Sequence, residues 1–289
     1  MPLTNPRWQQ FAQTIHDAPP VLPGRIDYAF KIVDSGRELL QAFELLYHEY
    51  LQAGYVGQSA SELLFTKHHL LPETTVFVAK AEDAVLSTAT VVRDCREFGL
   101  PMDDLFEDEL NAQRKQGRRI LEICSLASDG RKLSRKGVQN FIKLIFLYCI
   151  FLDVDDVCIM VNPRHVGLYT NLFGFMPIGE QKYYPRVNAP AVPMRVDVQQ
   201  SRENLGRKCF TFSYREHLHS RYLALKIALC DKILCTFQAE SHKTPPLNPL
   251  DACLLGHMLS VKSEVLQSLS AECQKILKSC YPGLCLETF

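Results

Sequence analysis

The sequence contains no apolar stretch long enough to cross a lipid bilayer. Its longest apolar run, residues 144–152, falls far short of the ~20 residues that a membrane-spanning helix needs. Residues 1–13 are polar and lack the apolar segment of a secretory signal peptide. We therefore expect no transmembrane segment and no signal peptide, and we expect a cytoplasmic protein.

An excess of charge and paired metal-ligand spacing are also missing. The 32 basic residues balance the 32 acidic ones, so no global field draws the chain to nucleic acid. The eleven cysteines include no C-x2-C pair, which predicts free thiols in a reducing compartment rather than disulfides. His68-His69 and His217-x-His219 lack a third ligand at suitable spacing. We therefore expect no metal site and no nucleic-acid partner.

Strand and helix signals alternate across residues 27–198. Alternating apolar residues predict a strand over 28–33 and a hairpin over 75–93, and Ser35 is a suitable N-cap for an amphipathic helix over 37–51. The further expected elements are a helix over 102–116, a strand over 119–127, a helix over 137–153, a strand over 157–161, a helix over 162–173, a strand over 175–178, a loop over 185–193 and a strand over 194–198. This order predicts an α/β fold with a mixed sheet and helices on both faces.

The last third of the chain carries helical periodicity without strand signals. Residues 209–237 and 250–280 are helical in period, and Asn248-Pro249 matches the N-cap and first position of the last helix. We therefore expect three regions: an N-terminal arm (1–26), a mixed domain (27–198) and a C-terminal helical segment (199–289).

The most informative motif begins at Asn162, after the apolar run at 157–161. Tyr169 follows about two helical turns later, so both side chains can face one cleft at the end of a strand. Gly174-Phe175 then matches a helix C-cap followed by a new strand. A tyrosine on a helix that faces a sheet is usually core. The spacing, however, resembles the strand–helix–strand unit of the GNAT acyltransferases. That resemblance implies that Tyr169 protonates the departing thiolate and that Asn162 orients the cleft.

The strand over residues 120–128 is expected to hold the acyl donor. The GNAT resemblance implies that two central strands splay apart and that a pantetheine arm hydrogen-bonds to the exposed strand edge. The backbone amides near Leu126 and Ser128 are the contacts that the resemblance implies.

Glu122 is the carboxylate inside this apolar strand. A low-dielectric cleft raises the pKa of a carboxyl, which suits a general base near neutral pH; the alternative is a structural salt bridge to Arg93 or Arg119. The segment E-I-C-S-L-A-S-D resembles the corresponding segment of acyl-homoserine-lactone synthases and N-acyl amino acid synthases. It departs from that pattern at Cys124 and Ser125, where Ser and Arg are usual, which disfavours a homoserine-lactone synthase.

Three further segments resemble the N-acyl amino acid synthases. They are A-F-E-L-L-Y-H-E-Y-L-Q-A-G-Y at 42–55, N-P-R-H-V-G-L-Y at 162–169 and Y-Y-P-R-V-N-A-P-A-V at 183–192. Leu46 replaces the arginine that is usual in the first of them. The combination implies an acyltransferase that uses acyl carrier protein.

The loop before Gly137 bears on the identity of the donor. CoA-using GNAT enzymes carry R/Q-x-x-G-x-G/A there, whose amides hold the pyrophosphate, whereas this chain has Ser134 at the first position and Gln139 at the last. A pyrophosphate fits poorly, but the single phosphate of phosphopantetheine could still bind. The cations beside this loop are Arg131, Lys132, Arg135 and Lys136. They predict a basic rim that steers an acidic carrier protein, or else a solvated surface.

The sequence therefore predicts an N-acyltransferase without a permanently bound cofactor. It would move a fatty acyl group from acyl-phosphopantetheine on acyl carrier protein to the amine of an amino acid or similar small amine, with acyl-CoA as the alternative donor. The rivals are a CoA-dependent GNAT acetyltransferase and a non-catalytic GNAT-like protein that binds a ligand or partner. The apolar stripe of the C-terminal helices would wall an acyl tunnel, complete the core or form a homodimer interface.

Overall fold

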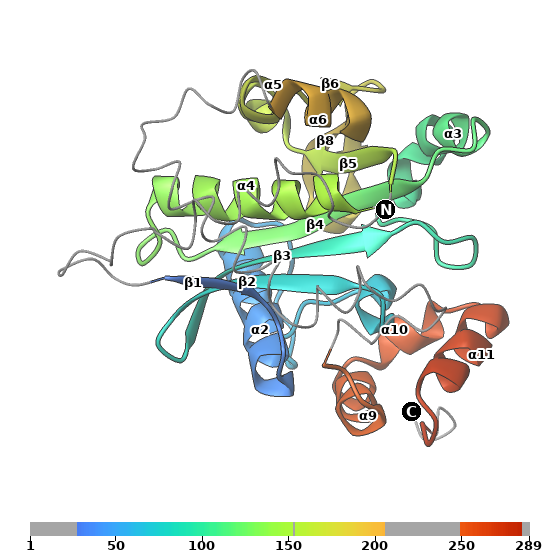
Figure 1. Ribbon diagram of the computed structural model, residues 1–289. Helices are drawn as coiled ribbons and strands as arrows, with labels where there is room; N and C mark the ends of the chain where they lie inside the picture. Colours follow the sequence, from blue (N-terminus) through green and yellow to red (C-terminus); the bar gives the residue numbers. More distant parts are fainter. Residues whose placement is uncertain (1–27, 153, 206–248, 285–289) are drawn as a thin grey trace, which may run out of the picture.

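The computed structural model describes residues 28–152, 154–205 and 249–284. The expected N-terminal arm, the expected helix over 209–237 and the pair His217 and His219 lie outside this part. Within it, an eight-stranded mixed sheet carries helices on both faces (Figure 1). No helix of the described part is both long and apolar enough to span a bilayer.

The elements follow the expected order, with one additional short strand. The strands are β1 (Ala29–Ile32), β2 (Thr75–Ala81), β3 (Ala84–Arg93), β4 (Ile120–Ser128), β5 (Asp156–Val161), β6 (Met176–Pro177), β7 (Lys182–Tyr184) and β8 (Ala189–Asp197). The α-helices are α2 (Gly36–Gln52), α3 (Asp103–Arg114), α4 (Arg135–Phe151), α5 (Val166–Phe173), α6 (Val198–Leu205), α9 (Ala252–Val261), α10 (Ser263–Gln267) and α11 (Ala271–Cys280). The 3₁₀ turns are η1 (Lys67–Leu70), η2 (Pro163–His165) and η3 (Pro185–Val187).

The middle of the sheet opens at one end. The strand order is β1-β2-β3-β4-β5-β8-β6, with β7 also paired to β8. The parallel strands β4 and β5 pair only from Ile120↔Asp156 to Glu122↔Cys158. Beyond that point β4 runs on to Ser128 and β5 to Val161 without pairing with each other. The expected splay of two central strands is therefore confirmed, and Glu122 lies at its vertex.

A bulge bends β4 within the splay. The register between β3 and β4 shifts between Thr88 and Thr90, and Ser125 adopts a positive φ of 52°. Bulges bend a strand and increase its twist, and a left-handed non-glycine residue stores about 1–3 kcal/mol of strain. The bulge therefore adds local distortion to β4 on the stretch that has lost its partner β5.

The expected loop over residues 185–193 was wrong. Residues 185–193 are not a loop, because β8 already begins at Ala189 and pairs with β7. Prolines made this stretch resemble a loop, yet β8 accommodates them. The carbonyl of Pro193 accepts from Ile178 N just past the end of β6, so the missing N–H falls at the margin of the β6 pairing.

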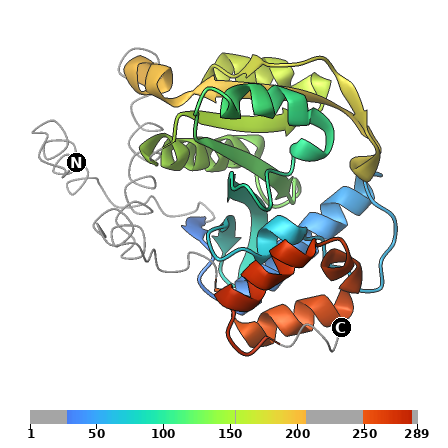
Figure 2. The same cartoon turned by 90° about the vertical axis from the view of Figure 1, so that its right-hand side faces the viewer.

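The C-terminal residues 250–280 form three helices rather than one. Asp251 caps α9 by accepting a hydrogen bond from Leu254 N, whereas the expected cap Asn248 lies outside the described residues. Lys262 breaks the helix with non-helical φ and ψ. Figures 1 and 2 show α9–α11 beside α2, on the side of the sheet away from α4. There they share one apolar core with α2, η1 and β2.

Candidate active site

Glu122 is a buried acid at the vertex of the splay. Its residue is 1% exposed, and its Oε2 accepts a hydrogen bond from Met102 N at 2.8 Å. Burial raises the pKa of Glu122 well above its usual range; the Met102 bond opposes this, and the nearby carboxylates of α3 add to it. The structural salt bridge to Arg93 or Arg119 that was considered from the sequence is not among the ion pairs of the described residues, and Arg119 pairs with Asp155.

Four side chains from separate elements form a group around Tyr50, and two of them, Cys124 and Tyr184, are also close enough to Glu122 to feel its charge. The four are Tyr50 of α2, Cys124 of β4, Tyr169 of α5 and Tyr184 of β7. Burial raises the pKa of Tyr50, and the proximity of the other three raises it further. Tyr50, Cys124 and Tyr169 keep partial exposure. The four sequence segments that resemble the N-acyl amino acid synthases therefore meet at one place.

Tyr169 combines a packed ring with a hydroxyl that forms no hydrogen bond among the described residues. Its ring lies against Phe173 and Phe175, with centroids 6.1 and 6.0 Å away. Among the described residues the hydroxyl has no hydrogen-bond partner. Burial raises the pKa of Tyr169 to about 12, so the phenol keeps its proton at neutral pH. The core interpretation holds for the ring, and the hydroxyl remains available as a proton donor.

The Asn162 side chain caps the turn that it begins. Its Oδ1 accepts from Arg164 N at 3.2 Å and so caps η2. The side chain that reaches the segment after α2 is that of Arg164, whose Nη2 donates to the Tyr55 hydroxyl at 3.1 Å. Tyr55 stacks edge-on against Tyr50 at 5.5 Å. The sequence had not singled out this bridge, although Tyr55 and Arg164 both stand within the quoted segments.

The donor-side residues of β4 follow the splay. Leu126 is half-buried and packs against the core beneath α4, whereas the Ser128 hydroxyl lies 2.6 Å from that of Ser87 on β3. Beyond Glu122, no described strand pairs with the β4 edge that faces β5. The backbone of this edge is therefore positioned to pair with an extended ligand.

Gly137 is held by its own helix end. Ser134 caps α4, and its Oγ accepts from Gly137 N at 3.1 Å; the expected helix thus begins at Arg135 rather than at Gly137. A Cβ on Gly137 would lie 2.6 Å from Leu133 Cδ1. Packing and capping therefore account for this glycine, and its amide can reach a phosphate only if the cap opens.

Four exposed cations border the start of α4. We call them the basic rim: Arg131, Lys132, Arg135 and Lys136. Asp129, at the end of β4, lies 3.3 Å from Lys132 Nζ and 3.7 Å from Arg131 Nε. The chain enters the rim directly from the splayed end of β4. The rim therefore lies beside the open end of the splay.

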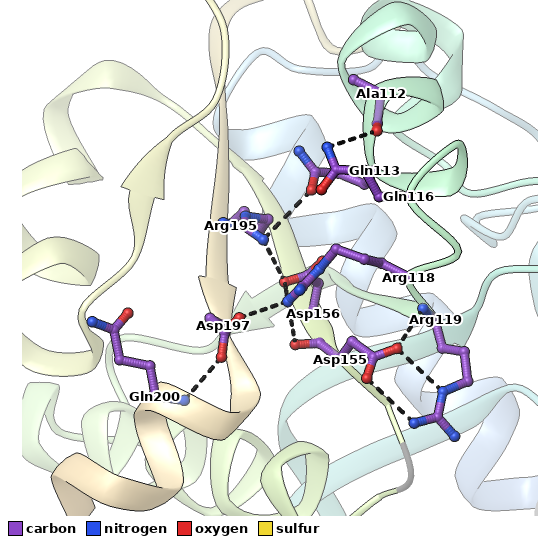
Figure 3. A network of polar contacts seen from close by, with 10 residues as sticks. All are labelled: Ala112, Gln113, Gln116, Arg118, Arg119, Asp155, Asp156, Arg195, Asp197 and Gln200. Carbon is purple, nitrogen blue, oxygen red and sulfur yellow. Dashed lines mark hydrogen bonds and ion pairs between the residues drawn. The ribbon is translucent and has the colours of Figure 1, made fainter.

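The opposite, paired end of β4 and β5 is clamped by charge. Asp156 is fully buried and accepts hydrogen bonds from Arg118 and from Arg195 Nη1, the latter at 2.7 Å (Figure 3). Arg118 also donates to Asp197 at 2.6 Å. This network joins the starts of β4 and β5 to the end of β8, so it holds together the end of the sheet that does not splay. No pattern in the sequence indicated this network.

The chain matches a known protein family. A family model described as N-acyl amino acid synthase FeeM matches residues 41–197, which is more than half of the chain. No curated protein sequence matches the chain.

Among solved structures, FeeM, an N-acyl amino acid synthase from uncultured soil microbes, is similar at 26% identity and a TM-score of 0.54. That similarity covers 61% of this chain and 94% of FeeM. The CoA-dependent acyl-homoserine lactone synthase BjaI has 11% identity and a TM-score of 0.48, over 68% of this chain and all of BjaI. The acyl-homoserine lactone synthase LasI has 14% identity and a TM-score of 0.47, over 60% of this chain and 91% of LasI. The chain therefore belongs to the N-acyl amino acid synthase FeeM family and is an acyltransferase with a GNAT-like fold.

Proposed function

We propose that this enzyme transfers a fatty acyl group from the phosphopantetheine of an acyl carrier protein to the amine of an amino acid or similar small amine. The observation that carries the proposal is the position of Glu122, a buried acid of raised pKa at the vertex of the splay. Tyr169, whose hydroxyl has no hydrogen-bond partner among the described residues, lies in the group of side chains around Tyr50, which Cys124 and Tyr184 connect to Glu122. An amine acylation needs a proton acceptor for the amine and a proton donor for the leaving thiolate, and these two residues fit the roles.

In this mechanism the pantetheine arm lies along the unpaired edge of β4, against the amides near Leu126 and Ser128. The amine passes its proton to Glu122 through a water molecule, since the carboxylate is 1% exposed. The nitrogen attacks the thioester carbonyl, the C–N bond forms and the C–S bond breaks. Tyr169 protonates the departing thiolate, and Asn162 fixes the turn that positions α5.

The choice of an acyl carrier protein rests on the start of α4. The amide of Gly137 is engaged by Ser134, which disfavours the amide cradle that a CoA pyrophosphate needs. The basic rim stands beside the open end of the splay, where a protein-bound pantetheine would enter. Carrier proteins are acidic, so the rim would steer their docking. Acyl-CoA remains the alternative donor.

The first test gives the full-length enzyme one acyl group on three carriers: an acyl carrier protein, CoA and free pantetheine. Products formed with a mixture of amino acids are identified by mass spectrometry. We expect N-acyl amino acids, with the highest kcat/KM for the carrier protein. A higher kcat/KM with acyl-CoA would favour the alternative donor, and the lack of any N-acyl product would remove the proposed function.

The second test reverses charge on the basic rim with Arg131→Glu, Arg135→Glu and Lys136→Glu together. We expect kcat/KM to fall about tenfold or more with the acyl carrier protein and little with acyl-pantetheine. The loss should shrink in high salt, because steering is screened beyond ~8 Å at physiological ionic strength. The control makes the same charge change at the exposed Arg96, Lys115 and Lys275. An equal loss with both donors would assign the rim to the fold or to the phosphate.

A further inference from the structure

The guanidinium of Arg114, the last residue of α3, joins two carboxylates from different parts of the chain. Its Nε and Nη2 donate to the two oxygens of Asp94 at 2.7 and 2.8 Å, and Asp94 directly follows β3. Its Nη1 and Nη2 donate to the two oxygens of Asp103, at the start of α3, at 2.7 Å each. Nη1 also donates to Asn111 Oδ1 at 3.0 Å. All five N–H groups of the guanidinium are therefore engaged, which fixes its orientation.

Asp103 connects Arg114 to the turn that precedes α3. Asp103 Oδ2 accepts a hydrogen bond from Leu100 N at 2.7 Å, and Leu100 O accepts one from Asp103 N at 3.0 Å. A Cβ on Gly99, whose φ is 63°, would lie 2.5 Å from Asp103 Oδ2, so only glycine leaves room for the carboxylate there. The turn over residues 99–102 is therefore held by a carboxylate that Arg114 itself holds.

The same turn supplies the hydrogen bond that Glu122 accepts. The last residue of the turn, Met102, is fully buried and donates its backbone N–H to Glu122 Oε2 at 2.8 Å. Burial raises the pKa of Glu122, and the Met102 bond opposes this effect because it favours the carboxylate over the neutral acid. The strength of that bond depends on where the turn places the amide. Arg114 thus acts on Glu122 through the backbone of the turn.

Arg114 also neutralises charge close to Glu122. The titratable groups that interact with Glu122 are three carboxyls, two thiols and one phenol: Asp94, Asp103, Asp104, Cys124, Cys158 and Tyr184. The three carboxylates raise the pKa of Glu122 beyond the effect of burial. Asp104 is paired with Arg186, whereas Asp94 and Asp103 share Arg114. Without Arg114, two carboxylates near Glu122 would lose their counter-ion.

We propose that Arg114 is a positioning residue for acyl transfer, because its clamp on the turn aims the Met102 N–H at Glu122. This inference rests on the proposed function, in which Glu122 accepts the proton of the amine. A general base must be ionised before it can take that proton. A displaced turn and two carboxylates without a counter-ion both favour the protonated acid. Loss of Arg114 therefore makes the enzyme require a higher pH to reach its full rate.

The test measures kcat/KM against pH for the full-length enzyme, with the acceptor that it acylates fastest. The acidic limb of this profile reports the pKa of the essential base. Arg114→Gln should move the limb about one pH unit or more toward higher pH, so that kcat/KM falls about tenfold below the limb and changes little above it. Arg114→Lys should recover part of the shift, because it restores the charge but not the planar fork.

Asp103→Asn should move the limb in the opposite direction. The substitution removes one negative charge near Glu122 and keeps an oxygen that can accept from Leu100 N, so the carboxylate form of Glu122 becomes easier to reach. The titration of Glu122 can also be followed without turnover, by 13C NMR of enzyme labelled at the glutamate carboxyl carbons. Its signal is assigned by its absence in Glu122→Gln. The pKa of Glu122 should be higher in Arg114→Gln and lower in Asp103→Asn than in the wild type.

The matched control is Lys115→Gln, which removes one positive charge from the exposed neighbour of Arg114 and should move neither the limb nor the Glu122 titration. A loss of activity in Arg114→Gln that is equal at every pH would assign Arg114 to the fold and overturn the inference. If Arg114→Gln does not fold, an unmoved limb in both Arg114→Lys and Asp103→Asn would overturn it as well. If the wild type forms no N-acyl product, the proposed function fails and takes this inference with it, whereas acylation with an unmoved limb removes the inference alone.

Discussion

At the scale of single residues, Glu122 is a carboxyl group in a buried position that disfavours its ionised form. A buried carboxylate with one backbone hydrogen bond is costly to ionise, and glutamine could accept the same bond from Met102 N. The acid is therefore not required for the contact that the structure shows. A substitution can therefore separate a structural role of this hydrogen bond, which needs only a carbonyl oxygen, from a role as general base, which needs the carboxylate.

Glu122→Gln should lower kcat by about 10²-fold or more, the usual size of a general-base contribution. Because the folded pKa is raised above its unfolded value of about 4.3, the unfolded chain loses its proton first as pH rises. The wild type therefore loses stability from about pH 4.3 up to the folded pKa, and the variant lacks this loss. Urea unfolding at pH 5 and pH 8, with single-turnover assays, measures both effects.

The exposed Glu107 on α3 provides the matched control, since Glu107→Gln removes a solvated carboxylate and should change neither quantity. A folded Glu122→Gln enzyme with normal turnover would exclude Glu122 from the reaction. A stability difference that is the same at pH 5 and pH 8 would show that the carboxyl does not titrate as its burial requires.

Tyr169→Phe should reduce turnover by about tenfold, less than Glu122→Gln, because a thiolate is already a fair leaving group. The melting temperature should hardly change, since phenylalanine keeps the contacts with Phe173 and Phe175 and no described hydrogen bond is lost. Calorimetry and acyl-transfer rates per folded molecule test this. A large loss of stability with normal turnover would leave Tyr169 as a core residue only.

At the scale of elements, the sequence predicted what local signals specify. Ser35 caps α2 through Glu38 N, as expected, and the hairpin turns at Glu82-Asp83. The errors arose where tertiary pairing overrides local signals, as in β8, whose prolines resembled a loop. The residues of the candidate site also fall into those that the sequence predicted and those that it did not. Glu122 could be found from the pattern of its strand, whereas the bridge between Tyr55 and Arg164 joins residues far apart in sequence and needed the fold.

The Asp156 network at the paired end of β4 and β5 should contribute strongly to the stability of the fold. Asp156→Ala removes a buried carboxylate from Arg118 and Arg195, which are only a quarter or so exposed. Breaking a buried ion pair on one side costs about 3–5 kcal/mol, and we expect the lower part of that range because Arg118 keeps Asp197. Urea unfolding measures the loss.

Asp155→Ala is the matched comparison, because Asp155 and Arg119 form a more exposed pair whose expected contribution is about 1 kcal/mol or less. Native-state hydrogen exchange should then show faster exchange of the β5 amides in Asp156→Ala than in Asp155→Ala. Similar losses in the two variants would mean that the Asp156 network does not hold the paired end of the splay.

At the scale of the whole molecule, the C-terminal helices pack against the part of the chain that matches the family. The match ends at residue 197, yet α9–α11 share their core with α2 and β2, and the Tyr281 hydroxyl donates to Leu70 O at 2.8 Å. The groove between α2 and α9 is lined from Gly36 to Glu44 on α2. At 1.5 Å per residue along α2, the residues that line this groove lie roughly 10–20 Å from Tyr50, so the groove does not favour an acyl tunnel at the splay. The core shared with α2 and β2 favours a core role for these helices.

Leu277→Ala tests whether the sequence-based boundary at residue 199 divides the molecule into separate folding units. Leu277 of α11 is fully buried in the shared core, so truncation should cost about 2–5 kcal/mol. Because β2 supplies Val76 and Val78 to that core, protection against hydrogen exchange should fall in β2 as well as in α11. Lys275→Ala, on the exposed face of the same helix, should alter neither. If only α11 exchanges faster while β2 keeps its protection, the C-terminal segment is a folding unit of its own.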